Sequence, residues 1–70
     1  MDPNETLRVL RDESEDVSVR IEAGEALDRW VANGGFMPHT TGYKVGGNTA
    51  AKLMLREEIL RTTERLKVVA

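Results

Sequence analysis

Residues 50–67 constrain the fold more than any other part of the chain. They are strong helix formers almost throughout, and Asn48 or Thr49 directly before them is a suitable N-terminal cap. Small or apolar residues recur along this segment with alternating spacings of four and three, the pattern of a helix packed nearly parallel or antiparallel to a neighbour. These residues are Ala51, Leu55, Ile59, Thr62, Leu66 and Val69. We therefore predict a long helix at residues 49–67 with one face in the core.

The same segment carries a second, narrower apolar stripe. Leu53 and Leu60 lie roughly 150° around the helix from the first stripe, at about 100° of rotation per residue. One short helical hairpin cannot easily cover both stripes, so these leucines are either ordinary exposed residues or a contact with another chain. The chain has no cysteine to staple its small core, which favours added burial through association. We expect a two-fold homodimer through this helix, and a helical monomer when both leucines become glutamate.

A short helix is predicted at residues 4–11. Asp2 and Asn4 are suitable caps for free backbone N–H groups, and Pro3 suits a first-turn position. Leu7 and Leu10 then share one face. Residues 12–16 carry four acids in five positions, and their mutual repulsion favours an interruption of the helix there.

Residues 17–33 allow two interpretations. Positions 17–21 alternate apolar and polar side chains, which is the period of a half-buried strand. A longer stripe with helical spacing continues to Val31 and ends at Asn33-Gly34-Gly35, a usual C-terminal signal. The longer pattern favours a helix at residues 19–33. Trp30 lies on this stripe, where an aromatic residue is more often core than binding anchor, and we expect its truncation to alanine to cost on the order of 3–5 kcal/mol.

Residues 34–47 hold five of the six glycines together with Pro38, so we interpret them as one long connection. Phe36, Met37 and Tyr43 within it are apolar enough to fold back over the core. The three helices and this glycine-rich connection predict a single small all-α domain over residues 1–70, in which the first two helices pack on the long third helix. A chain of this size buries only roughly 60% of the surface that it exposes when unfolded.

One stretch of the connection is close to a phosphate-binding loop. Residues 42–49, GYKVGGNT, place Asn48 where the G-x-x-x-x-G-K-[ST] pattern has the lysine that reaches the nucleotide phosphates. The pattern also needs a preceding buried strand, which the sequence does not offer. His39 is the only histidine, and neither a catalytic set of nucleophile, base and oxyanion donor nor a cluster with metal-ligand spacing is evident. We predict no enzyme, no cofactor and no metal site.

The charges are unevenly distributed. The first 33 residues hold nine acids and four arginines, whereas the rest holds six bases and three acids, which we interpret as pairing between two halves of one fold. The bases of the long helix alternate with acids and lack stacking aromatics, so nucleic acid is the less favoured partner. The alternative is a dimeric DNA-binding regulator of ribbon-helix-helix type. It would use residues 17–21 as its strand, residues 22–31 and 49–66 as its helices, and Arg20 as a major-groove contact.

Two segments resemble small uncharacterised proteins of actinobacteria and their phages. They are DPNETLR at residues 2–8 and ALDRWVANGGFMP at residues 26–38. Such proteins typically run D-P-N-x-T-L, an acidic stretch, a helix of the type A-L-D-x-W-L and a G-G-F-L-P ending. This chain has Val31 and Met37 where leucine is usual, and it adds the long helix after residue 48. The resemblance implies a small, cytoplasmic, helical, phage-encoded protein with no inherited active-site residues.

The function expected from these features is a non-enzymatic protein-interaction module, phage-encoded, that binds and modulates a host protein in the host cytoplasm. The N-terminal MDPNETL has neither a basic n-region nor an apolar h-region, and no apolar run is long enough to span a bilayer, so we expect no membrane partner. The residues expected to contact a partner are Leu53, Arg56, Leu60, Phe36 and Tyr43.

Overall fold

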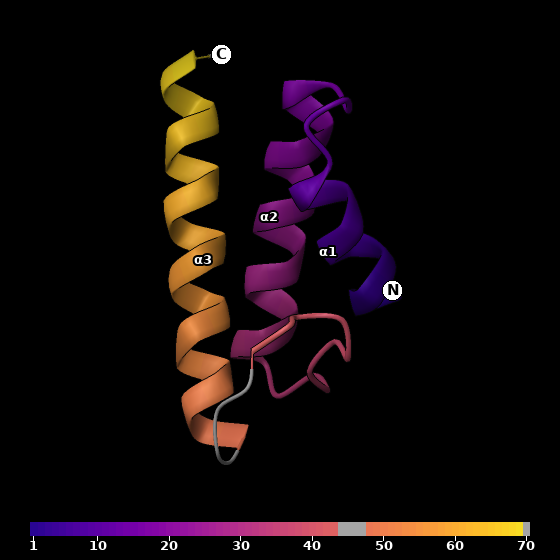
Figure 1. Cartoon of the computed structure of the whole chain (residues 1–70), viewed down its shortest axis with the longest axis vertical. Coiled ribbons are helices and arrows are strands. Elements are labelled where there is room, and N and C mark those ends of the chain that lie inside the picture. Colours follow the sequence, from indigo (N-terminus) through magenta and orange to yellow (C-terminus); the bar gives the residue numbers. More distant parts are fainter. Residues whose placement is uncertain (44–47, 70) are drawn as a thin grey trace.

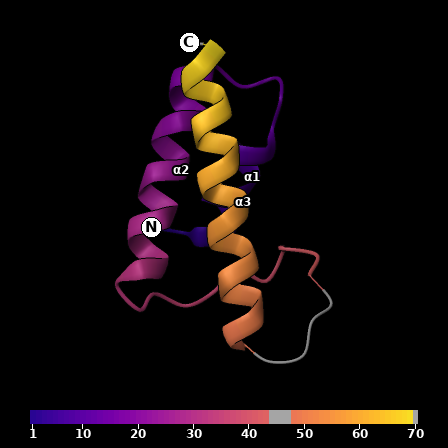
Figure 2. The same cartoon turned by 90° about the vertical axis from the view of Figure 1, so that its left-hand side faces the viewer.

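A computed structural model of the chain describes residues 1–43 and 48–69, and most of them lie in three α-helices. The helices are α1 (Pro3–Arg11), α2 (Val17–Ala32) and α3 (Asn48–Val69). α2 runs opposite in direction to α1 and α3 (Figure 1). Seen from the side, α3 crosses in front of α1 with α2 beside it (Figure 2). The predicted all-α fold with a long C-terminal helix is confirmed.

α2, and not α3, is the central helix of the fold. The backbones of α1 and α3 both pack extensively against α2, whereas the prediction placed the first two helices on the third. The physical reason is the short link at residues 12–16, because a link of a few residues makes consecutive helices antiparallel neighbours. α1 therefore folds back directly on α2, and its buried leucines reach the core from that side.

Aspartate side chains set where α1 and α2 begin. Asp2 Oδ1 accepts a hydrogen bond from the backbone N–H of Asn4 at 3.0 Å, and Asp16 Oδ1 accepts one from that of Ser18 at 2.8 Å. Both bonds satisfy N–H groups that have no partner within the helix. Because Asp16 caps α2, this helix begins at Val17, two residues earlier than predicted.

Residues 17–21 are helical, so the alternative interpretation of a strand there is wrong. Asp16, the last of the acids before them, caps the helix instead of flanking a strand. Arg20, which the ribbon-helix-helix alternative directs at DNA, donates from Nε to the backbone carbonyl of Leu10 at 3.0 Å. That carbonyl lies in the last turn of α1, where oxygens lack intrahelical donors. Within the described residues, the DNA-binding alternative therefore has no strand.

α2 ends in a hydrogen-bonded glycine turn. Gly34 has a φ of +84°, and the N–H groups of Gly34 and Gly35 donate to the carbonyls of Val31 and Trp30 at 3.2 and 2.8 Å. This is a Schellman motif, in which a left-handed residue after the helix lets the chain satisfy the last free carbonyls. The C-terminal signal predicted at residues 33–35 is confirmed, and the helix itself ends one residue earlier, at Ala32.

The core is one apolar cluster to which all three helices contribute. Its buried members are Leu7, Leu10, Leu27, Val31, Leu55, Ile59 and Leu66. On α3 the predicted stripe is confirmed at its three large members, but Thr63 is buried in place of Thr62, and Val69 is 69% exposed. Thr63 is buried because it faces Gly24, where the absence of a side chain lets α2 approach α3 closely.

The connection after α2 folds back against the core. Met37 and Tyr43 pack on the core cluster, as predicted, whereas Phe36 is 59% exposed. Trp30 is partly buried beside the cluster, its Nε1 donates to the carbonyl of Phe36 at 2.9 Å, and the two rings meet edge to face with centroids 5.5 Å apart. Trp30 therefore joins the connection to the core, as an aromatic ring with a polar edge often does.

Candidate functional site

Two apolar side chains lie on the side of α3 that the core does not use. Leu53 and Leu60 are 64% and 63% exposed, so the prediction that this second stripe lies outside the core is confirmed. They are seven positions apart, which places one above the other after two turns of helix, roughly 10 Å apart. Arg56 and Glu57 lie between them, and we call these four residues the outer α3 face.

Charged groups border the outer α3 face on both sides. On the side toward α2, Arg56 Nε lies 3.7 Å from Asp28 Oδ1. On the other side, Glu57 pairs with Arg61 one turn further along. All four side chains are about half exposed or more, and such surface pairs are worth about 0–1 kcal/mol. The charges are therefore free to exchange partners at little cost.

A small depression continues the outer α3 face along the α2 side. Gly24 and Thr63 line it, Leu60 borders it, and its volume is about 140 Å³. Lys67 also lines it and reaches across to α2, with Nζ 3.3 Å from Glu25 Oε2. The predicted pairing of the acidic first half with the basic second half is thus confirmed at two contacts between α2 and α3.

A polar cluster ties the connection to α1 and α3. Glu58 accepts hydrogen bonds from Arg11 Nη2 at 2.7 Å and Nε at 2.8 Å, and from the hydroxyl of Tyr43. Arg11 also donates to the backbone carbonyls of Thr40 at 3.0 Å and Thr41 at 2.9 Å. We call Arg11, Tyr43 and Glu58 the latch, because together they hold residues 40–43 against two helices.

The contacts of the latch stabilise the ionised form of Glu58 and the protonated form of Tyr43, the two forms that make its hydrogen bond. Hydrogen bonding to Arg11 holds the pKa of Glu58 below its ordinary value of 4.5, and the Tyr43 hydroxyl acts in the same direction. Burial, together with the bond to Glu58, raises the pKa of Tyr43 to about 12. Glu58 is therefore ionised and Tyr43 protonated throughout the neutral range.

The latch differs from the sequence-based predictions for Tyr43 and for the pair of Arg11 and Glu58. Tyr43 was expected at a partner surface, but its ring packs on the core and its hydroxyl is engaged, so this role stays a prediction with little side chain left for it. Sequence reasoning did not find the pair of Arg11 and Glu58, which are 47 positions apart. The only sequence signal was opposite charge on helices expected to pack together, and that signal does not select one pair among many.

Replacing Glu58 with glutamine is expected to remove a pH-dependent part of the stability. The folded-state pKa of Glu58 is depressed, so its carboxylate contributes stability that is present above about pH 4.5 and lost as the pH falls through the folded-state value. The free energy of unfolding should thus fall more steeply in the wild type than in Glu58→Gln between about pH 5 and pH 3.

Urea unfolding at a series of pH values measures this difference. Glu57→Gln is the matched control, because Glu57 is the adjacent acid and, among the described residues, pairs only with Arg61 at the exposed surface. Parallel pH profiles for the wild type and Glu58→Gln would contradict the role given to the latch.

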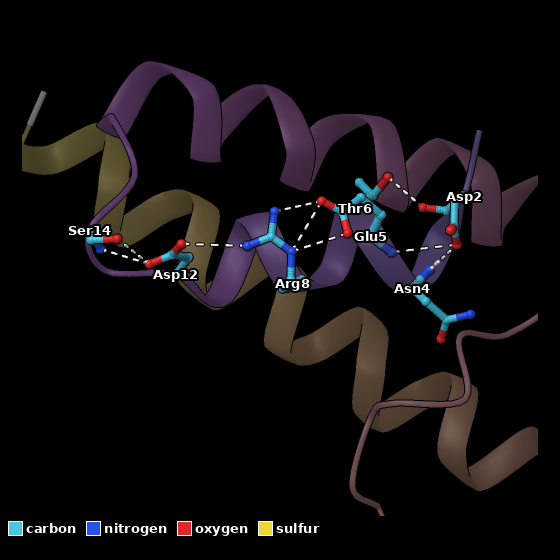
Figure 3. A network of polar contacts seen from close by, with 7 residues as sticks. All are labelled: Asp2, Asn4, Glu5, Thr6, Arg8, Asp12 and Ser14. Atoms are coloured by element: carbon cyan, nitrogen blue, oxygen red, sulfur yellow. Dashed lines mark hydrogen bonds and ion pairs between the residues drawn. The ribbon is translucent and has the colours of Figure 1, made fainter.

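A second polar network lies on the outer surface of α1 (Figure 3). Arg8 Nε donates to Glu5 at 3.1 Å, and its Nη1 lies 3.6 Å from Asp12 Oδ2. Asp12 Oδ1 accepts from the backbone N–H and the hydroxyl of Ser14 at 3.0 and 2.6 Å. Hydrogen bonds from Arg8 and from Ser14 lower the pKa values of Glu5 and Asp12 respectively. These exposed contacts support the two ends of α1, and we interpret them as structural.

The structure describes only part of the segments that were weighed as catalytic, nucleotide-binding or metal-binding sites. Residues 44–47 of GYKVGGNT and the side chain of Asn48 lie outside the described part of the chain. His39 is exposed, and its backbone N–H donates to Asn4 Oδ1 at 2.6 Å. Among the described residues, no group of three or more His, Asp or Glu could hold a metal ion. The absence of enzyme activity and of a cofactor stays a prediction.

Comparison with known proteins finds nothing similar. No family model, no curated protein and no solved structure matches the chain. Across residues 1–43 and 48–69, no helix has the length and apolar character needed to cross a membrane. The resemblance to small proteins of actinobacteria and their phages, and the cytoplasmic location that it implies, stay predictions.

Proposed function

We propose that the chain is a non-enzymatic protein-interaction module that presents the outer α3 face to a partner protein. One observation carries the proposal: Leu53 and Leu60 are 64% and 63% exposed, while Leu55 and Ile59 on the same helix are at most 1% exposed. Single exposed leucines are common and need no explanation. Here two of them are aligned on one helix face, two turns apart, between charged borders.

The outer α3 face suits a helical partner. Recognition between a helix and an apolar surface uses anchors repeated at helical spacing, with charges at the edges that fix the register. Burying each leucine contributes roughly 1.5–3 kcal/mol, from which the cost of association is subtracted. The expected affinity is therefore micromolar or weaker. The resemblance described above supplies the expected context of a phage-encoded chain.

Photo-crosslinking with competition tests this function. A photoreactive residue in place of Glu64, next to the outer α3 face, is expected to give a discrete crosslinked product in cells that express the chain. Excess wild-type chain, enlarged by a fused tag, should suppress this product whether the partner is another protein or a second copy, and excess Leu53→Gln/Leu60→Gln with the same tag should not. Glutamine is used because it keeps a helix propensity close to that of leucine and adds no charge beside Glu57.

A control position distinguishes the face from the rest of the surface. The same photoreactive residue in place of Glu22, which is exposed on α2, should not give that product. Equal suppression by the wild-type and the double variant, or no discrete product from position 64, would contradict the proposed function.

A further inference from the structure

We propose that the partner of the outer α3 face is a second copy of this chain, bound as a parallel two-fold dimer through α3. This inference rests on the proposed function, because it names the partner of the same surface. In Figure 2, α3 lies in front of α1 and beside α2, and no described helix lies on the viewer's side of it. Leu53 and Leu60 are likewise uncovered by the described chain, at 64% and 63% exposed. A second α3 can therefore lie alongside it.

The order of side chains around α3 is self-complementary for a parallel pair. Arg56 lies on the α2 side of the leucine stripe, next to Asp28, and Glu57 lies on the other side. At about 100° per residue, each is displaced by roughly 50° from the stripe, in opposite directions. A two-fold axis parallel to α3 exchanges the two sides, so Arg56 of one copy meets Glu57 of the other copy at nearly the same height. This contact occurs twice, once on each edge.

An antiparallel pair lacks this match. A two-fold axis perpendicular to α3 keeps each edge on its own side, so Arg56 would face Arg56 of the second copy and Glu57 would face Glu57. Like charges set opposite each other disfavour that arrangement. In the parallel pair, Leu53 and Leu60 instead pack each on its own counterpart in the second copy.

The next two turns of α3 repeat the same order of charges. Lys67 lies on the α2 side, where it pairs with Glu25, and Glu64 lies on the other side of the stripe. A parallel pair therefore adds a contact between Glu64 of one copy and Lys67 of the other. The present partners of Arg56 and Lys67 are about half exposed, so exchanging them is inexpensive.

The contact is small, so the dimer is weak. Two leucines and two charged pairs per copy fall well below the roughly 800 Å² per partner of a standard stable interface. We expect a dissociation constant on the order of 10–100 μM. A dimer of this strength forms where the local concentration of the chain is high.

Single cysteines test the orientation, because the chain has none of its own. Under mild oxidation at about 200 μM, above the expected dissociation constant, Leu53→Cys alone and Leu60→Cys alone are each expected to form a disulfide-linked dimer. An antiparallel dimer would instead crosslink only when the two variants are mixed. Glu22→Cys on α2 is the control for random collision. Crosslinking confined to the mixture, or no faster than for Glu22→Cys, would overturn the inference.

Charge exchange tests the edges independently. In sedimentation equilibrium, Arg56→Glu and Glu57→Arg are each expected to weaken the dimer about tenfold, and the double exchange to restore it to within about threefold. Arg65→Glu is the control for Arg56→Glu, because it makes the same change in net charge at an exposed position on the other side of α3. A double exchange as weak as either single one would overturn the parallel arrangement.

The two proposals fail in different ways. A wild-type chain that stays monomeric at about 500 μM, while the photo-crosslinking competition still gives a discrete product with another protein, would overturn the dimer and leave the proposed function standing. Loss of both the dimer and the crosslinked product would overturn both.

Discussion

Leu55→Ala is expected to lower the free energy of unfolding by roughly 2–5 kcal/mol. Leu55 is fully buried among the core leucines, and truncating such a residue to alanine costs roughly 2–5 kcal/mol. A domain of this length has a total stability of roughly 3.5–10 kcal/mol, at about 0.05–0.15 kcal/mol per residue. One truncation therefore removes a large part of the total.

Urea unfolding followed by circular dichroism measures this loss. Met54→Ala is the matched control on the same helix. Because Met54 is 42% exposed, its truncation removes less buried apolar surface than the truncation of Leu55. Equal losses at positions 54 and 55 would contradict the assignment of the core face of α3.

Gly24→Ala is expected to destabilise the protein by about 1–3 kcal/mol, although alanine is the better helix former. A Cβ at position 24 would lie 2.3 Å from Thr63 Oγ1 and 3.2 Å from Leu10 Cδ1. A Cβ does not approach another atom to 2.3 Å, so either Thr63 must turn or α2 and α3 must move apart. Both responses disturb the packing of the two helices.

The double variant Gly24→Ala/Thr63→Ala is expected to recover most of this loss. Thr63 Oγ1 is buried and has no hydrogen-bond partner among the described residues, so removing it takes away a desolvated hydroxyl. The methyl group added at position 24 then occupies the space that the hydroxyl leaves. A thermodynamic cycle over the four proteins should give a coupling of about 1–3 kcal/mol between the two positions. Additive effects would show that Thr63 is not what excludes a side chain at position 24.

The spacing of apolar residues predicted the helices where that spacing extended over several turns. The stripe on residues 50–67 predicted both faces of α3, because a single helical period fixes which side chains lie together. The glycines at positions 34 and 35 predicted the end of α2 for the same kind of reason, since backbone conformation there is decided within a few residues. The start of α2 was predicted two residues late because the alternating pattern at positions 17–21 obscured the cap that Asp16 provides.

Contacts between distant segments were not predictable in the same way. The latch joins Arg11 to Glu58 through a connection that the sequence marks only as glycine-rich, and many other acids and bases have similar local surroundings. The sequence pattern placed Thr62 in the core, whereas Thr63 is the buried residue. Which of the two is buried depends on how closely α2 approaches α3 at Gly24, and the spacing of apolar residues does not predict that distance. The outer α3 face was predicted because its exposure follows from the same helical period as the core.

The proposed function requires that the fold use one side of α3 and be stable without the outer α3 face. Its most direct test is the free energy of unfolding of Leu53→Gln/Leu60→Gln, measured beside the wild type at a concentration where both are monomeric. We expect the same value for both proteins within about 0.5 kcal/mol, as for substitutions at exposed positions. A loss of more than about 1 kcal/mol in the double variant would show that these leucines stabilise the fold itself, and would contradict the proposed function.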